Sequence, residues 1–361
     1  MGNRLTIGRG RWLRGARALG LVLVLGVAAC GAPSVGTTRV VIPPGSTFRV
    51  AADSLQRAGV VRSARLFRIY ASLGGHDRHI RAGTYLMSRG MSWGEVVKAL
   101  TQGTGLIHTV TIPEGYAIAD IVQLLARALG VQPESVEVAA RDSAMRRRLD
   151  VPTPTLEGYL FPDTYSFPDG TTGRAAVETM VRRFEQIWQP QWNDRLRALA
   201  MTRHQVITLA SIVETEARLA PERPVIAAVY LNRLRAGMRL QADPTVQYAL
   251  GKHVGRLMYK DLLIESPYNT YKYKGLPPGP IASPGRASIV AALNPAAVPY
   301  RYFVAHLDGH HEFHVDFASH SRAVAAVRRE RNAAAAAAAQ PPPAPAPQPA
   351  AKKAIRSGRR S

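Results

Sequence analysis

The sequence predicts an α+β protein with an N-terminal membrane anchor, a small domain of β-α units and a mainly helical domain with short strands. Three observations support this prediction. A basic and then apolar segment occupies residues 1–32, a strand–turn–helix pattern occurs twice in residues 33–152, and helical spacing of apolar residues dominates residues 153–331. Residues 332–361 are rich in alanine and proline, and we expect a disordered basic tail there.

The composition suits two ordinary domains with flanking segments, because 46% of the 361 residues are hydrophobic and 20% are charged. The formal net charge is +22, from 47 basic and 25 acidic residues. A basic chain can bind nucleic acid, anionic lipid or an acidic polymer. The sequence holds no helix-turn-helix, zinc-finger or RNA-binding signature, so nucleic acid is not expected as a partner.

The N-terminal segment has the pattern of a signal or anchor sequence, with five arginines ahead of an apolar run from Ala18 to Ala32. That run is shorter than the ~20 residues that span a bilayer comfortably. It includes Cys30, the single cysteine of the chain, in a context that resembles a bacterial lipobox, where the cysteine carries lipid. A lipid-modified Cys30 and an uncleaved signal anchor both stay open. Either one attaches the body to the outer side of the cytoplasmic (inner) membrane, because arginine-rich flanks stay inside.

The small domain contains an internal repeat. Residues 42–45 and 112–115 each follow a predicted strand and precede a predicted amphipathic helix, at a shift of 70 positions. A short strand at 83–87 and a helix that Ser92 caps lie between the two copies. Small β-α units of this kind resemble LysM modules, which hold the N-acetyl sugars of cell-wall glycan. A structural spacer is the alternative interpretation.

The central helix of the second domain is predicted over residues 205–217, where apolar residues recur at helical spacing. Thr202 and Gln205 fit a capping box at its start. Two glutamates, Glu214 and Glu216, stand within this apolar run. A buried carboxyl is costly unless it is paired or protonated, and a carboxyl that is protonated near neutral pH is what a general acid requires. We expect Glu216 to point to solvent near the helix end.

Further helices are predicted from about Arg223 to Ala236, from Asp243 as N-cap to Gly251, and from Ser283-Pro284 to about Asn294. Strands are expected at 302–305 and 311–317. The proline-rich loop 275–281 is predicted to be rigid, as a binding rim would be. Five histidines between positions 306 and 320 match no zinc spacing, so neither a metal nor a cofactor is expected.

Six strings of the sequence resemble the endolytic murein transglycosylases, the YceG-like family, and together they span about residues 35–330. The strings occupy residues 156–165, 210–216, 229–234, 238–246, 266–271 and 275–281. Their length and order make the resemblance specific. The resemblance implies that the chain cleaves the bond between N-acetylmuramic acid and N-acetylglucosamine in peptidoglycan and leaves a 1,6-anhydro end.

The same resemblance places the catalytic glutamate at Glu214. Residues that hold glycan or orient this glutamate are expected in the neighbouring motifs, at Glu157, Asn232, Gln241, Asp243, Asn269 and Tyr271. The implied partners are glycan strands, the cytoplasmic membrane and the synthases that extend nascent strands.

Two other functions stay open on the sequence. One is a non-catalytic scaffold that binds the wall through the small domain and the basic surface. The other is a muramidase that uses two carboxylates, Glu214 and Glu157, in ordinary glycoside hydrolysis.

Overall fold

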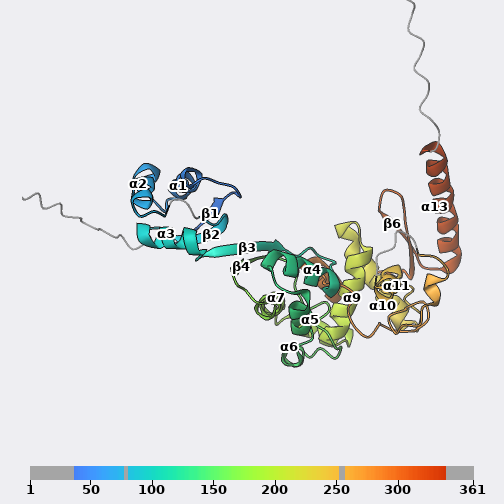
Figure 1. Cartoon of the computed structure of the whole chain (residues 1–361). Helices are drawn as coiled ribbons and strands as arrows, with labels where there is room; N and C mark the ends of the chain where they lie inside the picture. Colours follow the sequence, from blue (N-terminus) through green and yellow to red (C-terminus); the bar gives the residue numbers. More distant parts are fainter. Residues whose placement is uncertain (1–35, 77–79, 252–256, 339–361) are drawn as a thin grey trace, which may run out of the picture.

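A computed structural model describes residues 36–76, 80–251 and 257–338, and it confirms the mixed α+β class (Figure 1). The predicted anchor with Cys30 and the tail beyond residue 338 lie outside the described residues. None of the helices in the described ranges combines the length and the apolar character that crossing a bilayer requires.

Two hydrophobic cores organise the described chain, one built from residues 40–106 and the other from residues 110–293. We call the parts around them the smaller unit and the larger unit. The smaller unit contains β1 (Thr37–Ile42), α1 (Phe48–Arg57), α2 (Ala64–Leu73), β2 (Gly83–Ser88) and α3 (Trp93–Gln102).

The larger unit is mainly helical. Its elements are α4 (Ile118–Leu129), α5 (Pro133–Ala140), α6 (Ser143–Arg148), β4 (Thr164–Pro168), α7 (Gly173–Ile187), α8 (Trp192–Leu199), α9 (Arg203–Glu216), the 3-10 turn η1 (Ala220–Glu222), α10 (Arg223–Arg235), α11 (Asp243–Leu250), the 3-10 turn η2 (Asp261–Leu263), α12 (Arg286–Leu293), β5 (Tyr302–Ala305), β6 (His311–His314) and α13 (Phe317–Ala338).

Strand β3 (Leu106–Thr111) joins the two units. Leu106 at its start packs in the smaller core, whereas Val110 near its end packs in the larger core. The antiparallel sheet has the order β1-β2-β3-β4, and β2 and β3 share only the pairs Thr84–Ile107 and Tyr85–Leu106. Figure 1 shows β3 and β4 running together from the smaller unit to the larger one. The segment 110–151 therefore packs with the larger unit, although its sequence pattern repeats that of the smaller one.

The predicted repeat is confirmed in its local structure, because β1 leads through a turn to α1 and β3 leads through a turn to α4. Gly45 and Gly115 occupy equivalent places in the two turns, with φ of 74° and 79°. This left-handed region favours glycine because a Cβ atom there meets the backbone. The predicted cap of α3 by Ser92 is confirmed, and Glu95 completes a capping box with it.

Helix α9 is the centre of the larger core. Its eight consecutive residues from Val206 to Val213 are all buried, and it packs against α8, α10, α11 and α12. A helix that is enclosed on every side is a core element rather than a surface one. The capping box of Thr202 and Gln205 is present at its start, as predicted, and the helix ends at Glu216.

Two predicted helix starts are wrong. Ala242, not Asp243, is the N-cap of α11, and the Asp243 carboxylate accepts a hydrogen bond from the Tyr271 hydroxyl instead. Helix α12 begins at Arg286 rather than at Ser283-Pro284. Ser283 is held in an extended conformation, because its N–H donates to Tyr116 O at 2.8 Å and its carbonyl accepts from Gly115 N at 2.9 Å.

The two cores predict separate responses to the loss of a helix cap. Ser92→Ala removes the acceptor of Glu95 N, and Thr202→Ala removes the acceptor of Gln205 N. Each change is expected to cost about 1 kcal/mol. Amide hydrogen exchange on the full chain should then accelerate in α1 with the first variant and in α9 with the second. Equal acceleration of both helices by either variant would contradict two separately stabilised units.

Candidate active site

The last turn of α9 carries the two glutamates that the sequence singles out. They are two positions apart, and successive residues of an α-helix are rotated by about 100°. Glu214 and Glu216 must therefore point to nearly opposite sides of the helix. Each carboxyl meets a different set of neighbours, and the two sets differ in kind.

Glu214 is paired and enclosed. Its side chain is 6% exposed, its Oε1 lies 3.2 Å from Arg223 Nη2, and its Oε2 accepts a hydrogen bond from Gly285 N at 2.8 Å. Arg223 also donates from Nε to Ser288 Oγ at 3.0 Å. The ion pair therefore ties the end of α9 to the start of α10 and to the start of α12. Glu214 is therefore an ion-paired carboxylate and not an isolated acid.

A third carboxyl, Glu114, lies beside this pair and was not selected from the sequence. A Cβ atom at Gly285 would fall 1.8 Å from Glu114 Oε1, so any other residue there would require the Glu114 side chain to shift. Burial raises the pKa of Glu114, the Glu214 carboxylate raises it further, and Arg223 acts in the opposite direction. The internal repeat could have drawn attention to Glu114, because the equivalent position in the first copy is Pro44.

Glu216 lies in the wall of a cavity. The prediction that it points to solvent is wrong, because its Oε1 accepts a hydrogen bond from the Tyr230 hydroxyl at 2.9 Å. Burial raises the pKa of Glu216 to about 7, the hydrogen bond from Tyr230 lowers it, the Asp243 carboxylate raises it, and Arg233 lowers it. The negative end of the α9 dipole also disfavours an anion in this last turn. Glu216 is therefore a carboxyl that can hold its proton near neutral pH.

The cavity next to Glu216 has a volume of about 840 Å³. This is within the range of ~300–1,000 Å³ that small-molecule sites occupy. Its polar lining comes from segments far apart in the sequence: Asp120, Glu137, Arg141, Thr155, Glu157, Thr215, Glu216, Arg218, Asp243, Gln247, Tyr248 and His311. Glu214 is not among the lining residues. The cavity thus brings together the predicted site residues Glu157 and Asp243 with the glutamate that the sequence set aside.

Glu157 is the other carboxyl of the cavity whose pKa is raised to about 7. It is 4% exposed, and Ile118 N, at the first residue of α4, lies 3.1 and 3.2 Å from its two oxygens. The Tyr248 hydroxyl donates to Oε2 at 3.3 Å. Burial raises the pKa of Glu157 to about 7, against these hydrogen bonds. Glu157 thus anchors the start of α4 and contributes to the cavity wall.

The other predicted site residues have mainly structural contacts. Asn232 Nδ2 donates to the carbonyls of Val298 and Tyr300, and Asn269 Nδ2 donates to those of Leu262 and Ile264. These four distances are 2.8–2.9 Å, and neither asparagine lines the cavity.

Gln241, Asp243 and Tyr271 lie beside the network of Glu216. Gln241 is exposed, and its Oε1 accepts from Arg233 Nη1 at 3.4 Å. Burial, the hydrogen bond to Asp243 and the Asp243 charge raise the pKa of Tyr271 in that order. Of these three residues, Asp243 is the one that reaches the cavity.

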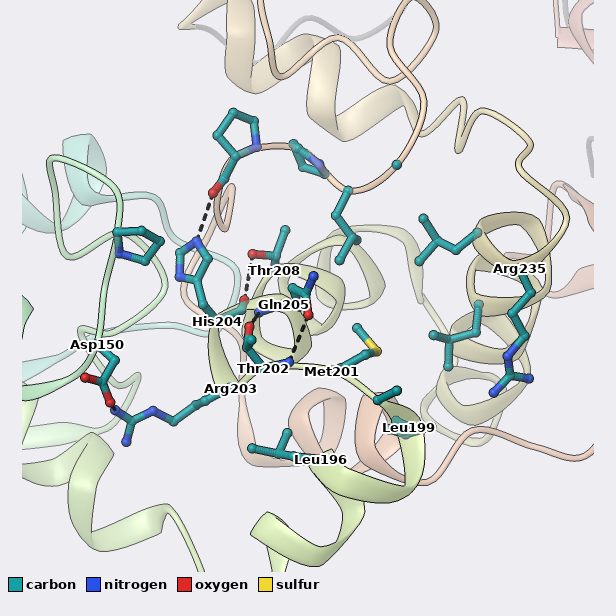
Figure 2. A pocket seen from close by; sticks show the side chains of 18 of the residues that line it. Asp150, Leu196, Leu199, Met201, Thr202, Arg203, His204, Gln205, Thr208 and Arg235 are labelled. Atoms are coloured by element: carbon teal, nitrogen blue, oxygen red, sulfur yellow. Dashed lines mark hydrogen bonds and ion pairs between the residues drawn. The ribbon is translucent and has the colours of Figure 1, made fainter.

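The second cavity, with a volume of about 1,100 Å³, lies at the opposite end of α9 (Figure 2). Figure 2 shows His204 reaching the proline-rich loop, where its Nε2 lies 2.9 Å from Pro278 O. Asp150 is the one acidic residue among its described lining residues, and its side chain is 91% exposed. An exposed carboxylate lacks the apolar surroundings that keep a proton at neutral pH, in contrast to Glu157 and Glu216 in the first cavity.

The histidines of the β5–β6 region pair with acids. His311 Nδ1 lies 2.7 Å from Glu222 Oε2, and His306 Nε2 lies 3.2 Å from Glu312 Oε2. Within residues 36–76, 80–251 and 257–338, no group of three or more His, Cys, Asp or Glu side chains is arranged to hold a metal ion.

A helical core that presents carboxyls with raised pKa, Glu157 and Glu216, to a ligand-sized cavity is an arrangement suited to acid–base chemistry on a bound substrate. The chain belongs to the YceG-like family, whose sequence model matches residues 40–326. It is similar to a protein of Bacillus subtilis (strain 168) that is named endolytic murein transglycosylase. The two are 34% identical over 302 residues, which cover 80% of this chain and 84% of the relative.

A protein of Streptococcus pneumoniae serotype 2 (strain D39) with the same name is 31% identical over 295 residues. The match covers 73% of this chain and 53% of the pneumococcal protein, so the chain spans about half the length of that relative. A crystal structure of a yceG-like protein from Listeria monocytogenes matches with a TM-score of 0.58 and 34% identity. It covers 79% of this chain and 98% of the listerial one.

The buried carboxyl of Glu157 predicts a pH dependence of stability. The folded protein holds this proton more tightly than the unfolded chain does, because burial raises the pKa from 4.5 to about 7. This tighter binding of the proton contributes about 3 kcal/mol to the free energy of unfolding below pH 4.5. The contribution is lost as the pH rises to 7. Glu157→Gln should remove this loss.

The measurement is urea unfolding of both proteins at acidic and mildly alkaline pH, followed by tryptophan fluorescence. The quantity compared is the difference between wild type and variant, because other groups titrate in both. Exposed Glu134→Gln is the matched control. A wild-type-minus-variant difference that does not change with pH would contradict the enclosed carboxyl.

Proposed function

We propose that this chain is an endolytic lytic transglycosylase of peptidoglycan, and that Glu216 is its general acid. The observation that carries the proposal is the Glu216 carboxyl, which lines a ligand-sized cavity and has a pKa raised to about 7 by burial. Membership of the YceG-like family and the names of the relatives support the reaction. Glu214, to which the family resemblance assigns this role, is the alternative acid; Glu216 is preferred here because it lines the cavity, whereas Glu214 is ion-paired with Arg223 and accepts a hydrogen bond from Gly285 N.

The reaction needs one carboxyl and no water. The Glu216 proton passes to the glycosidic oxygen between N-acetylmuramic acid and N-acetylglucosamine, the bond from that oxygen to the muramic C1 breaks, and an oxocarbenium-like sugar forms. The Glu216 carboxylate then accepts the proton of the muramic C6 hydroxyl while the C6 oxygen bonds to C1. The products are a 1,6-anhydro end and a free 4-hydroxyl, and the carboxyl regains its proton.

Tyr230 orients the acid for this step. Its hydroxyl donates to Glu216 Oε1, which leaves Oε2 to carry the transferred proton. After the first transfer the same hydrogen bond stabilises the carboxylate, since a donor strengthens its bond to an anion. Asp243 acts against this by its negative charge and favours return of the proton.

A second candidate reaction is hydrolysis by a two-carboxylate muramidase, and Glu157 is the observation that favours it. Glu157 and Glu216 line the same cavity, and ordinary glycoside hydrolysis uses two carboxyls flanking the bond. Glu157 would then act as the base for water, and the products would carry reducing ends. The capping of Ile118 by both Glu157 oxygens favours the one-carboxyl reaction.

The smaller unit and the N-terminal segment support a place at the cell wall. The order β1-α1-α2-β2, with β1 and β2 paired antiparallel, is compatible with a LysM-like module that holds glycan. The arginine-rich and apolar residues 1–32 would anchor the chain in the cytoplasmic membrane with its body outside. Cleavage there would end nascent strands near the synthases that extend them.

The test of the reaction compares two matched substitutions in the same helix turn. Glu216→Gln keeps the acceptor for Tyr230 but has no proton to donate, so anhydro-ended fragments from purified glycan strands should fall to the background level. Glu214→Gln keeps an acceptor for Gly285 N, and it should retain measurable activity. Mass spectrometry of the released fragments is the readout, and circular dichroism checks that both variants fold.

Three outcomes discriminate between the assignments. Loss of activity in Glu214→Gln with activity kept in Glu216→Gln would return the role to Glu214. Reducing ends in place of anhydro ends, lost in Glu157→Gln, would establish the muramidase. Glycan binding without any cleavage by the unmodified protein would leave only a scaffold.

The mode of anchoring has its own test. In cells fed a palmitate analogue, a lipid-modified Cys30 should make the protein carry the label, and Cys30→Ala should abolish it. Membrane fractionation of both proteins is the control. Unlabelled protein that still sediments with membranes would identify an uncleaved signal anchor.

A further inference from the structure

The outward face of α2 is apolar and exposed. Leu66, Ile69, Tyr70 and Leu73 are 55%, 50%, 42% and 85% exposed. Their positions follow the i, i+3, i+4, i+7 spacing that places side chains on one face of a helix. Each is a large side chain, so together they form a continuous stripe along all of α2. We call these four residues the α2 stripe.

Most of the α2 stripe lies away from the face by which α2 joins the smaller core, and Tyr70 lies at its edge, where its ring meets Trp93 at 5.5 Å between centroids. Ala64, Phe67 and Ala71 are buried on the core face, and at 100° per residue their arc is centred about half a turn from the stripe. A helix that is apolar on two opposite faces is normally covered on both. The described residues cover one face, and an exposed apolar patch of this kind marks an interaction surface.

The charged residues of α2 and of its flanking segments are basic. Arg62 and Arg65 are exposed beside it, and residues 58–76 contain three arginines and no acidic residue. The sequence from 36 to 106 holds ten basic and three acidic residues. Aliphatic side chains and a tyrosine flanked by arginines suit the interface of an anionic bilayer, where the apolar groups enter the acyl boundary and the cations meet phosphates.

We propose that the α2 stripe binds to the surface of an anionic lipid bilayer. The position of the unit in the chain supports this occupant and rests on the proposed N-terminal anchor. Four residues separate Ala32, the end of the apolar run, from Thr37, the start of β1, and they span at most about 18 Å. The smaller unit therefore stays beside whichever bilayer holds the anchor.

A second copy of the chain fits the α2 stripe less well. A two-fold contact between two α2 helices brings the same patch of both copies together. Arg62 and Arg65 of one copy would then approach the arginines of the other, with no acid on the helix to offset their repulsion. Anionic lipid headgroups supply the missing charge.

Binding of the α2 stripe to a bilayer would also affect the reaction. The sheet β1-β2-β3-β4 continues from the smaller unit into the larger one, and β3 leads directly to the turn at Gly115 that lines the cavity of Glu216. A smaller unit held on the bilayer by α2 would fix the height at which the cavity meets a glycan strand.

The experiment uses the full chain in vesicles made of equal parts phosphatidylglycerol and phosphatidylcholine, or of phosphatidylcholine alone. Photoreactive benzoylphenylalanine is placed at Leu66 or at Leu73, and, as the matched control, at Val138, which is 72% exposed on α5 of the larger unit. Mass spectrometry after illumination counts phospholipid adducts. The stripe positions should give several-fold more adduct than Val138, and Arg62→Glu with Arg65→Glu should reduce this excess on the anionic vesicles.

Adduct yields at Leu66 and Leu73 no higher than at Val138 would overturn the proposal that the α2 stripe binds the bilayer. Cross-links in native membranes to another protein, or to a second copy of this chain, instead of lipid would overturn it too. Anhydro-ended products are measured on the same proteins. Activity without lipid adducts at the stripe would reject only the proposed lipid binding. Lipid adducts at the stripe without activity would support the lipid binding and reject the proposed reaction.

Discussion

The constraint on which the site depends is the burial of α9. Because Val206–Val213 are enclosed on all sides, an unpaired carboxylate in the middle of this helix would be costly, and both glutamates stand in its last turn. Because Glu214 and Glu216 point to nearly opposite sides of the helix, each carboxyl has a different environment. Glu214 is paired with Arg223, whereas Glu216 lines a cavity and has a pKa that burial raises to about 7.

One helix supplies the partner for each glutamate. Arg223 begins α10 and binds Glu214, and Tyr230, seven positions later on the same face, donates to Glu216. The packing of α10 on α9 therefore sets both environments together. The ion pair of Glu214 with Arg223 also holds the last turn of α9 in place beside the cavity.

The walls of the cavity are fastened to α9 and to its neighbours by backbone hydrogen bonds. Ile281 N donates to Ser211 Oγ at 3.0 Å, and Ser283 exchanges two hydrogen bonds with Gly115 and Tyr116. The proline-rich loop thus links the two cavities along α9, since Pro278 borders the cavity at its start and Ile281 the one at its end. A wall with few free torsions loses little entropy when a substrate binds.

The sequence by itself determined the α+β class, the repeat of strand, turn and helix, and the capped apolar helix with its two glutamates, because spacing and capping chemistry are local properties. It could not assign the glutamates. Periodicity gives the face of a side chain but not what lies against that face, and the family resemblance pointed to Glu214. Arg223, Gly285 and Glu114, which surround Glu214, are 9, 71 and 100 positions away in the chain. Only the tertiary packing brought them there and left Glu216 with the cavity, because burial and charge at a carboxyl are decided by residues distant in sequence.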